Sequence, residues 1–274
     1  MDIKLPRMNS GLSMPEYRAA DAWSKSDLDK IHKSPAHYLA PREEESPALA
    51  FGSALHCAVL EPIEFFSRFV VAPQCDRRTK DGKAEFAAFE LSAAGKTIIT
   101  ADDNAKISGM RQAIFNHPLA KTIFQDGEAE LSFFWIDSAT GLKCKCRPDY
   151  YRRDGILIDL KSTVSSDPRD FSRAMAIYRY HVQAAYYTDG IFNVGDFSGF
   201  EAPTDFLFVA IEKELPYGIR IFRIDDQSLT AGRAVYKRDL QAVIDWQANP
   251  DFYASAIYPD SVEILPLTLP AWAE

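Results

Sequence analysis

Two aspartates and one lysine in the middle of the chain have the residue types and spacing that metal-assisted phosphodiester cleavage requires. Asp149 lies near the end of residues 142–150 (LKCKCRPDY), and Asp159 and Lys161 stand two positions apart in residues 156–161 (ILIDLK). Carboxylate oxygens bind Mg²⁺, which polarises a phosphate and lowers the pKa of a bound water. The lysine ammonium can orient or help deprotonate that water, or stabilise negative charge in the transition state. A backbone carbonyl such as that of Leu160 would complete the metal shell.

Asp159 carries most of this local signal. It interrupts an apolar run, Ile-Leu-Ile-Asp-Leu, where a carboxylate is costly unless it is paired or bound to a metal. An aspartate and a lysine two residues apart are otherwise common, and the alternative is a strand edge protected by charges.

The alternation of side chains along a strand assigns faces to these residues. In residues 143–149, the charged side chains share one side and Cys144 and Cys146 point to the other, which we expect to be the core. If this strand and the next pair as a hairpin, Asp149, Asp159 and Lys161 converge at one end of the sheet. The basic residues predicted to contact DNA phosphates are Lys143, Lys145 and Arg147 on this face, with Arg77, Arg78, Lys80 and Lys83 in a loop. The alternative is a solvated charged surface.

A helix after these strands presents Gln183 and Tyr187 one turn apart, so both lie on one face. There they could contact a DNA phosphate or position a metal-bound water. The alternative is an amphipathic helix whose tyrosines pack with their polar tips outward.

The surrounding pattern predicts one α/β domain. Strands are expected at 130–136, 142–150, 156–161, 204–211 and 218–224, and helices from a Ser24 cap, at 48–60, from 102 to about 117, at 168–188 and at 228–246. This gives a core of helix, three strands, helix and strand, with a mixed sheet flanked by helices and an N-terminal helical extension. We divide the single domain into a helical and loop extension (1–100), a catalytic core (101–247) and a docking tail (248–274).

Composition limits the classes of protein. The chain has 274 residues, of which 47% are hydrophobic and 26% charged, so wholesale disorder is excluded. A net charge of −8 argues against nonspecific coating of nucleic acid, although not against a metal-dependent nuclease. No apolar run reaches the roughly 20 residues of a membrane helix, and the N-terminus has no secretory apolar segment. We expect a cytoplasmic protein without a membrane partner.

Together these residues resemble the RecB-like branch of the PD-(D/E)xK nuclease superfamily, in which a Q-x-x-x-Y helix follows the D…D-x-K core. The likeness is closer still to nuclease domains of the RecE type, exodeoxyribonuclease VIII. It rests on G-x-A-x-H-C-x-V-L-E-P at residues 52–62, C-x-C-R-P-D at 144–149 and Y-H-V-Q at 180–183, and it extends from about Gly11 onward.

The resemblance implies a site and an activity. His56 and Glu130 match family residues beside the metals, with Glu128 as the substitute for Glu130 if the register is shifted. The implied enzyme binds two Mg²⁺ ions, with Mn²⁺ able to substitute, and degrades one strand of duplex DNA from its 5′ end. It would release 5′-mononucleotides and leave a 3′ overhang for a RecT-like single-strand annealing protein. A homo-oligomeric ring around DNA and a phage origin would fit.

Two other functions stay open at this stage. The D…D-x-K core does not separate an exonuclease from an endonuclease or resolvase on the same fold. A non-catalytic subunit that binds DNA ends is the alternative outside the enzymes. Clustered carboxylates beside phosphate disfavour it, because they repel the ligand unless cations neutralise them.

Overall fold

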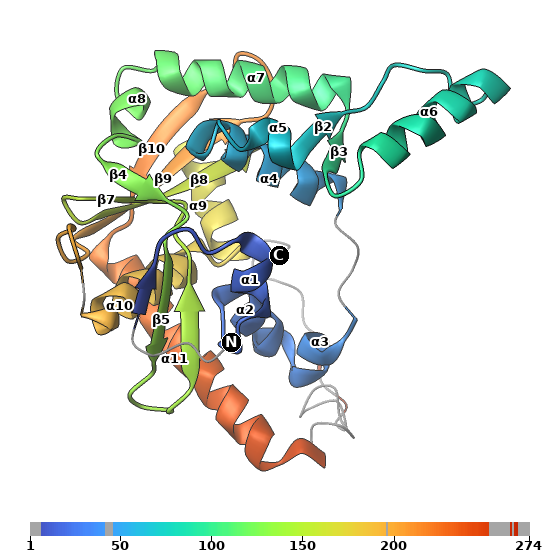
Figure 1. Cartoon of the computed structure of the whole chain (residues 1–274). Coiled ribbons are helices and arrows are strands. Elements are labelled where there is room, and N and C mark those ends of the chain that lie inside the picture. The colour runs from blue at the N-terminus through green and yellow to red at the C-terminus, as the bar shows by residue number, and fades with distance from the viewer. Residues whose placement is uncertain (1–6, 42–45, 196, 252–263, 265, 268–274) are drawn as a thin grey trace.

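The computed structural model describes residues 7–41, 46–195, 197–251, 264 and 266–267 (Figure 1). Its main sheet has the strand order β10-β9-β8-β7-β4. The strands are β4 (Gly127–Ala129), β7 (Tyr150–Arg152), β8 (Ile156–Thr163), β9 (Asp205–Glu212) and β10 (Ile219–Arg223). Strand β8 pairs in parallel with β9, whereas the other pairings in this sheet are antiparallel. The expected mixed sheet is confirmed.

A second sheet and a short pair of strands accompany the main sheet. The second sheet, in the order β1-β5-β6, contains β1 (Arg7–Asn9), β5 (Ser132–Ile136) and β6 (Lys143–Cys146). Strands β2 (Phe69–Val71) and β3 (Thr97–Ile99) pair in parallel. The chain therefore passes from the second sheet into the main sheet between β6 and β7.

This passage corrects two predicted strands. Residues 142–150 form two strands in different sheets, separated by Arg147, Pro148 and Asp149. Pro148 has no N–H to donate to a strand ladder, which suits it to a break. Residues 130–136 do not form one strand either, because β5 begins at Ser132 and Glu130 has a φ of +55° between β4 and β5. Both breaks place acidic side chains where the two sheets meet.

Eleven helices of the described residues surround these sheets. They are α1 (Met14–Ala19), α2 (Lys25–Lys33), α3 (Pro35–Leu39), α4 (Pro47–Leu60), α5 (Phe65–Arg68), α6 (Lys80–Ser92), α7 (Ala101–Asn116), α8 (Ala120–Ile123), α9 (Pro168–Ile177), α10 (Tyr180–Val194) and α11 (Asp226–Ala248). Ser24, Thr100 and Asp225 begin α2, α7 and α11 by accepting hydrogen bonds from backbone N–H groups three residues later. None of these helices is both long and apolar enough to cross a membrane.

One predicted helix and one predicted loop were wrong in part. The helix expected at 168–188 is two helices, α9 and α10, separated at Arg179, whose φ of +57° is left-handed. The loop expected to carry Arg77, Arg78, Lys80 and Lys83 ends before its two lysines, because α6 begins at Lys80 with the Thr79 side chain accepting from the Gly82 N–H. The docking tail predicted for 248–274 lies mostly outside the described residues.

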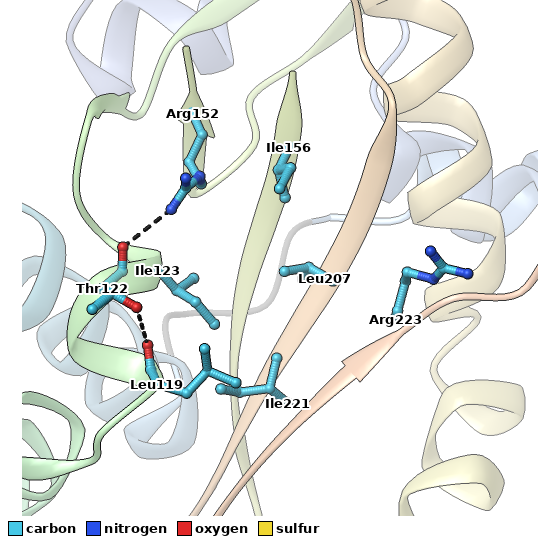
Figure 2. Close-up of a pocket in the computed structure, with 8 residues that line it drawn as sticks. All are labelled: Leu119, Thr122, Ile123, Arg152, Ile156, Leu207, Ile221 and Arg223. Atoms are coloured by element: carbon cyan, nitrogen blue, oxygen red, sulfur yellow. Dashed lines mark hydrogen bonds between the residues drawn. The ribbon is translucent and has the colours of Figure 1, made fainter. Parts of the chain in front are cut away.

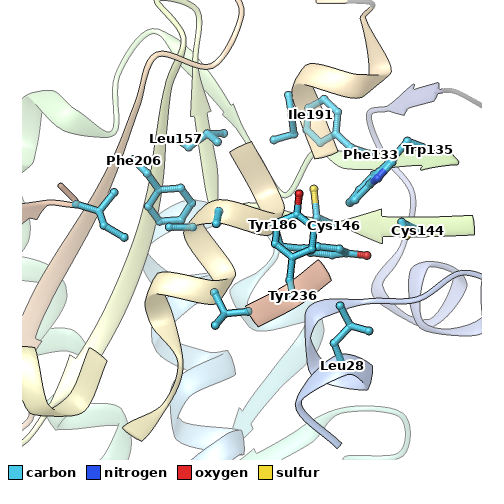
Figure 3. Packing of buried hydrophobic residues seen from close by; sticks show 14 of the residues in the cluster. Leu28, Phe133, Trp135, Cys144, Cys146, Leu157, Tyr186, Ile191, Phe206 and Tyr236 are labelled. Carbon is cyan, nitrogen blue, oxygen red and sulfur yellow. The ribbon is translucent and has the colours of Figure 1, made fainter. Parts of the chain in front are cut away.

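Apolar side chains cover both faces of the main sheet. Leu157 of β8 packs in a cluster with residues of α2, α10 and α11 and with Cys144 and Cys146 of β6. Figure 3 shows both cysteines near Trp135 and Tyr186 in this cluster. Ile158 and Leu160 join a second cluster with α4, α7 and α8 on the other face. Side chains therefore alternate between the two faces along β8. The predicted burial of Cys144 and Cys146 is confirmed.

Candidate active site

The register of the β7–β8 hairpin brings the two aspartates together. Tyr150 pairs with Ile158, so Asp149, which directly precedes β7, comes opposite Asp159. The Asp149 Oδ2 atom accepts a hydrogen bond of 2.7 Å from the Leu160 N–H. The convergence that the hairpin predicted is present.

Three side chains from separate elements form a candidate metal site beside this hairpin. His56 comes from α4, Glu130 from the connection between β4 and β5, and Asp149 from the connection between β6 and β7. One potential ligand atom of each lies within 4.8 Å of the other two. His56 Nδ1 is 3.3 Å from Asp149 Oδ2, and the Glu130 N–H donates to the Asp149 carbonyl at 3.1 Å. This cluster is close enough to bind one cation together.

The backbone at Glu130 supports this assignment. A φ of +55° is rare for a residue with a side chain, and such conformations persist where the surrounding structure fixes them. Glu128, the substitute considered from the sequence, is half-exposed and lies 3.2 Å from the Arg153 guanidinium. Glu130 is therefore the acidic residue that reaches the site.

Without a cation, His56 and Glu130 of this cluster hold their protons at neutral pH. Burial alone would lower the pKa of His56, but the charge and hydrogen bond of Asp149 outweigh burial and raise that pKa to about 9. Burial and the neighbouring Asp149 charge raise the pKa of Glu130 to about 8. The pKa of Asp149 is lowered: burial opposes ionisation, but His56, Lys161 and the Leu160 N–H favour the charged form. At neutral pH the cluster therefore pairs an ionised Asp149 carboxylate with a protonated His56 imidazolium, while Glu130 retains its proton.

Asp159, Lys161 and Gln183 form a second, more buried group next to the cluster. Asp159 is only 1% exposed, and its Oδ2 atom accepts a hydrogen bond from the Gln183 amide. The Gln183 carbonyl oxygen accepts in turn from Lys161 Nζ at 3.0 Å. Lys161 Nζ also lies 2.5 Å from Asp159 Oδ1. Burial and the Asp149 charge raise the pKa of Asp159, whereas the two aspartates raise that of Lys161 against the effect of burial.

The residues present fit a divalent cation. Asp159 Oδ1 is buried, and although it lies close to Lys161 it has no partner with hydrogen-bond geometry. A buried carboxylate oxygen in that state has an unused lone pair. The donor set of one imidazole and several carboxylates matches Mn²⁺ and Mg²⁺ better than softer metals. Asp159 lies outside the three-residue cluster, so the number of ions stays a prediction.

Leu160 and Tyr187 occupy supporting positions. The N–H and C=O of one strand residue point to the same edge, so the carbonyl of Leu160 faces the edge where its N–H meets Asp149. Tyr187 follows Gln183 by one turn of α10, half-buried, with its ring 6.4 Å from that of Phe206. The roles predicted for both in binding metal or water stay predictions.

The basic face predicted within residues 143–149 is wrong for two of its three basic members. Lys145 is 4% exposed, and its ammonium donates to the carbonyls of Tyr17, Arg18 and Ala20 at the end of α1. Arg147 is also buried, donating to the Ser132 hydroxyl and the Leu12 carbonyl. Strand alternation separates two faces but does not show which face a further layer covers. The N-terminal segment supplies that layer, so neither side chain presents a surface to phosphate.

Tyr17 is a neighbour of the site that sequence reasoning missed. Its ring lies against the guanidinium of Arg147 at 4.5 Å, and Arg147 Nη1 is 3.9 Å from Glu130 Oε2. Arg147 therefore links α1 to a candidate metal ligand. The residue types and spacing around Tyr17 gave no signal of this contact, because Arg147 lies 130 positions later in the chain.

The other predicted phosphate contacts lie apart from the acidic cluster. Lys143 is exposed at the start of β6 and pairs with Asp21 at 3.3 Å. Arg77, Arg78, Lys80 and Lys83 are exposed on and before α6, which extends away from the sheets (Figure 1). The Arg77 guanidinium lies 3.9 Å from the Phe86 ring centroid. Their contact with DNA stays a prediction.

A shallow pocket of about 340 Å³ lies elsewhere on the main sheet (Figure 2). It is lined by Leu119, Thr122, Ile123, Arg152, Ile156, Leu207, Ile221 and Arg223. Ile156 begins β8, roughly 16 Å along the strand from Lys161. This pocket is therefore separate from the acidic cluster.

Comparison with known proteins supports this interpretation of the fold. Residues 24–252 match the family described as a "PDDEXK-like domain of unknown function (DUF3799)", and the chain belongs to that family. The crystal structure of a protein from Eubacterium rectale, described as "Putative exonuclease", aligns with a TM-score of 0.55. It is 16% identical, over 85% of this chain and 87% of that one, a likeness that shows the fold alone.

Two further comparisons add nothing to the argument. The structure of SSO0001 aligns over 90% of this chain and 96% of that chain with 15% identity, but its TM-score is 0.31. No curated protein matches the sequence. The PD-(D/E)xK nuclease fold is thus established by the family match and the arrangement of the sheet.

Proposed function

We propose that this member of the PDDEXK-like family is a divalent-metal-dependent nuclease that degrades duplex DNA from a 5′ end. The single observation that carries the nuclease proposal is the meeting of His56, Glu130 and Asp149 beside the Asp159–Lys161 pair. The exonuclease polarity rests on the sequence resemblance to RecE-type domains. The protein from Eubacterium rectale with a similar fold carries the description "Putative exonuclease", which agrees with this proposal.

In the proposed hydrolysis, the metal ligands, Lys161 and Gln183 have different roles. A cation held by His56, Glu130 and Asp149, with Asp159 adjoining, would polarise the phosphate and acidify a bound water. Lys161 remains an ammonium at neutral pH, because the two aspartates raise its pKa. It is therefore suited to orient the attacking water and stabilise transition-state charge, and unsuited to accept a proton. Gln183 positions Asp159 and Lys161 relative to each other.

The remaining parts of the proposal follow the resemblance. The products would be 5′-mononucleotides and a duplex with a 3′ overhang, which a RecT-like annealing protein would bind. The enzyme would use two Mg²⁺ ions, or Mn²⁺, and act as a homo-oligomeric ring in the cytoplasm. His56 supports the use of Mn²⁺, because imidazole is a poorer ligand for Mg²⁺ than an oxygen donor is.

The test is digestion of linear duplex DNA labelled at the 5′ or the 3′ end, beside a closed circle. Each reaction is run with Mg²⁺, with Mn²⁺ and with chelator. We expect loss of linear DNA only, starting at the 5′ end and only with metal. The Asp159→Asn variant should be inactive but folded, whereas Glu128→Gln, on the strand that leads to Glu130, should retain activity.

Other outcomes identify the alternatives. Cutting of the circle would indicate an endonuclease or resolvase. Retained binding to DNA ends without any digestion would indicate a non-catalytic end-binding subunit, and would contradict the nuclease proposal.

A further inference from the structure

The corner between α9 and α10 places exposed apolar side chains beside the candidate active site. Ile177, the last residue of α9, is 72% exposed, and Tyr178 is 61% exposed. Two residues later, Tyr180 begins α10, and its ring centroid is 4.7 Å from Lys161 Nζ. Large exposed apolar groups next to a catalytic lysine have no role in the hydrolysis described above.

The backbone of this corner is held in place by buried charges. Arg179 adopts φ +57° and ψ +41°, a left-handed conformation that costs free energy for a residue other than glycine. Its guanidinium pairs with Asp29, at 3.1 Å, and with Asp239. Lys25 Nζ donates to the Tyr178 carbonyl at 3.0 Å. Charges from α2 and α11 therefore fix the direction in which the corner projects.

An aromatic series connects the exposed ring to the catalytic lysine. The Tyr178 and Tyr180 rings are stacked, with centroids 5.7 Å apart and an interplanar angle of 24°. Besides stacking on Tyr178, the Tyr180 ring packs against Phe208 and Phe171, with centroid distances of 5.7 and 5.9 Å. Tyr180 is thus anchored in the core, and Tyr178 extends the series by one ring into solvent.

We propose that Tyr178 is a stacking platform for an unpaired nucleobase of the strand that is being cut. This inference rests on the proposed nuclease function, because Lys161 locates the scissile phosphate and Tyr178 lies one ring away from it. Every base has a π-face, so stacking on a tyrosine tolerates any sequence, as a general nuclease requires. Bases within a duplex are stacked on both sides, so the platform selects a nucleotide at an opened end.

The competing explanation is that Tyr178 only shields Tyr180 and Lys161 from water. The two explanations differ in their dependence on the substrate. A shielding role affects cleavage of every substrate equally, whereas a stacking role disappears when the substrate has no base to stack.

The experiment compares an ordinary oligonucleotide duplex with one whose terminal few nucleotides on the cut strand are abasic. KM for cleavage, and the dissociation constant by fluorescence anisotropy with Ca²⁺ replacing Mg²⁺, are measured for the wild type, Tyr178→Ala and Tyr178→Phe. Ile177→Ala is the matched control, because it removes a neighbouring large side chain that is also exposed but has no ring to stack on a base. Thermal unfolding of each variant checks that it is folded.

We expect Tyr178→Ala to weaken binding of the ordinary duplex roughly 5- to 150-fold, the range for loss of one stacked base. Tyr178→Phe and Ile177→Ala should bind like the wild type, and the abasic duplex should not distinguish Tyr178→Ala from the wild type. An equal loss on both duplexes, or no loss on either, would overturn the inference. If the wild type cuts neither duplex, the nuclease proposal fails, and the anisotropy measurements alone still decide whether Tyr178 stacks on a base.

Discussion

Replacing Gln183 with leucine tests how the buried amide organises the reacting groups. The change keeps a side chain of similar size but removes a donor to Asp159 Oδ2 and an acceptor for Lys161 Nζ. Hydrogen bonds to charged groups contribute about 1.5–3 kcal/mol each. The 2.5 Å contact between Asp159 and Lys161 remains in the variant. We therefore expect the lost interactions to amount to about 2–4 kcal/mol in total, less than the sum of two such hydrogen bonds.

If that loss falls on the transition state, kcat/KM decreases about 30- to 1,000-fold, since each 1.36 kcal/mol is a factor of ten. The assay is single-turnover digestion of 5′-labelled linear duplex with saturating Mg²⁺, alongside urea unfolding of the same protein. A folded Gln183→Leu protein with wild-type kcat/KM would refute the reasoning, because the amide would then have no part in positioning Lys161.

Gln183→Glu is the control that keeps the size and shape of the side chain. A glutamate still accepts from Lys161, but it donates to Asp159 only when it is protonated. The deficit of this variant relative to the wild type should therefore shrink as pH falls. A deficit that does not depend on pH would show that the lost donor is not the cause.

Three more predictions concern metal binding and packing. Mn²⁺ affinity, measured by calorimetry, should rise with pH up to about 9, because His56 must lose its proton to bind the cation. An affinity that does not change with pH would contradict this prediction. Lys145→Met should lower the free energy of unfolding by about 2–4 kcal/mol, measured in urea, because carbonyls at the end of α1 lose their buried donor. Gly190→Ala places a carbon 2.3 Å from the Trp135 ring and should lower the free energy of unfolding by about 1–3 kcal/mol. Gly52→Ala, which has open space around the new carbon, should leave the free energy of unfolding unchanged.

The core of the site could be predicted because its chemistry is local in the sequence. A carboxylate inside an apolar strand requires a partner, and the two-residue period of β8 fixes which residues share its face. Asp159 and Lys161 therefore lie together as expected. The direct hydrogen bonds of Gln183 to both of them were not predicted. The helix starts at Ser24 and near Asp102 follow from short-range capping, which a sequence shows directly.

Long-range contacts account for the errors. The burial of Lys145 and Arg147 depends on a segment more than 120 residues earlier in the chain. The break at Arg179 has no glycine or proline to mark it, because ion pairs with Asp29 and Asp239 hold the left-handed backbone. No period or spacing within either segment reports these partners.

The position of Arg147 has a consequence for the residues that precede the family match at position 24. Its guanidinium contacts the Leu12 carbonyl and the Tyr17 ring on one side and approaches Glu130 on the other. A protein shortened to begin at Ser24 would keep every candidate ligand yet expose a cation that now lies enclosed. Divalent-ion affinity should therefore respond to proteolysis or fusion at the amino-terminal segment, although that segment contributes no ligand of its own.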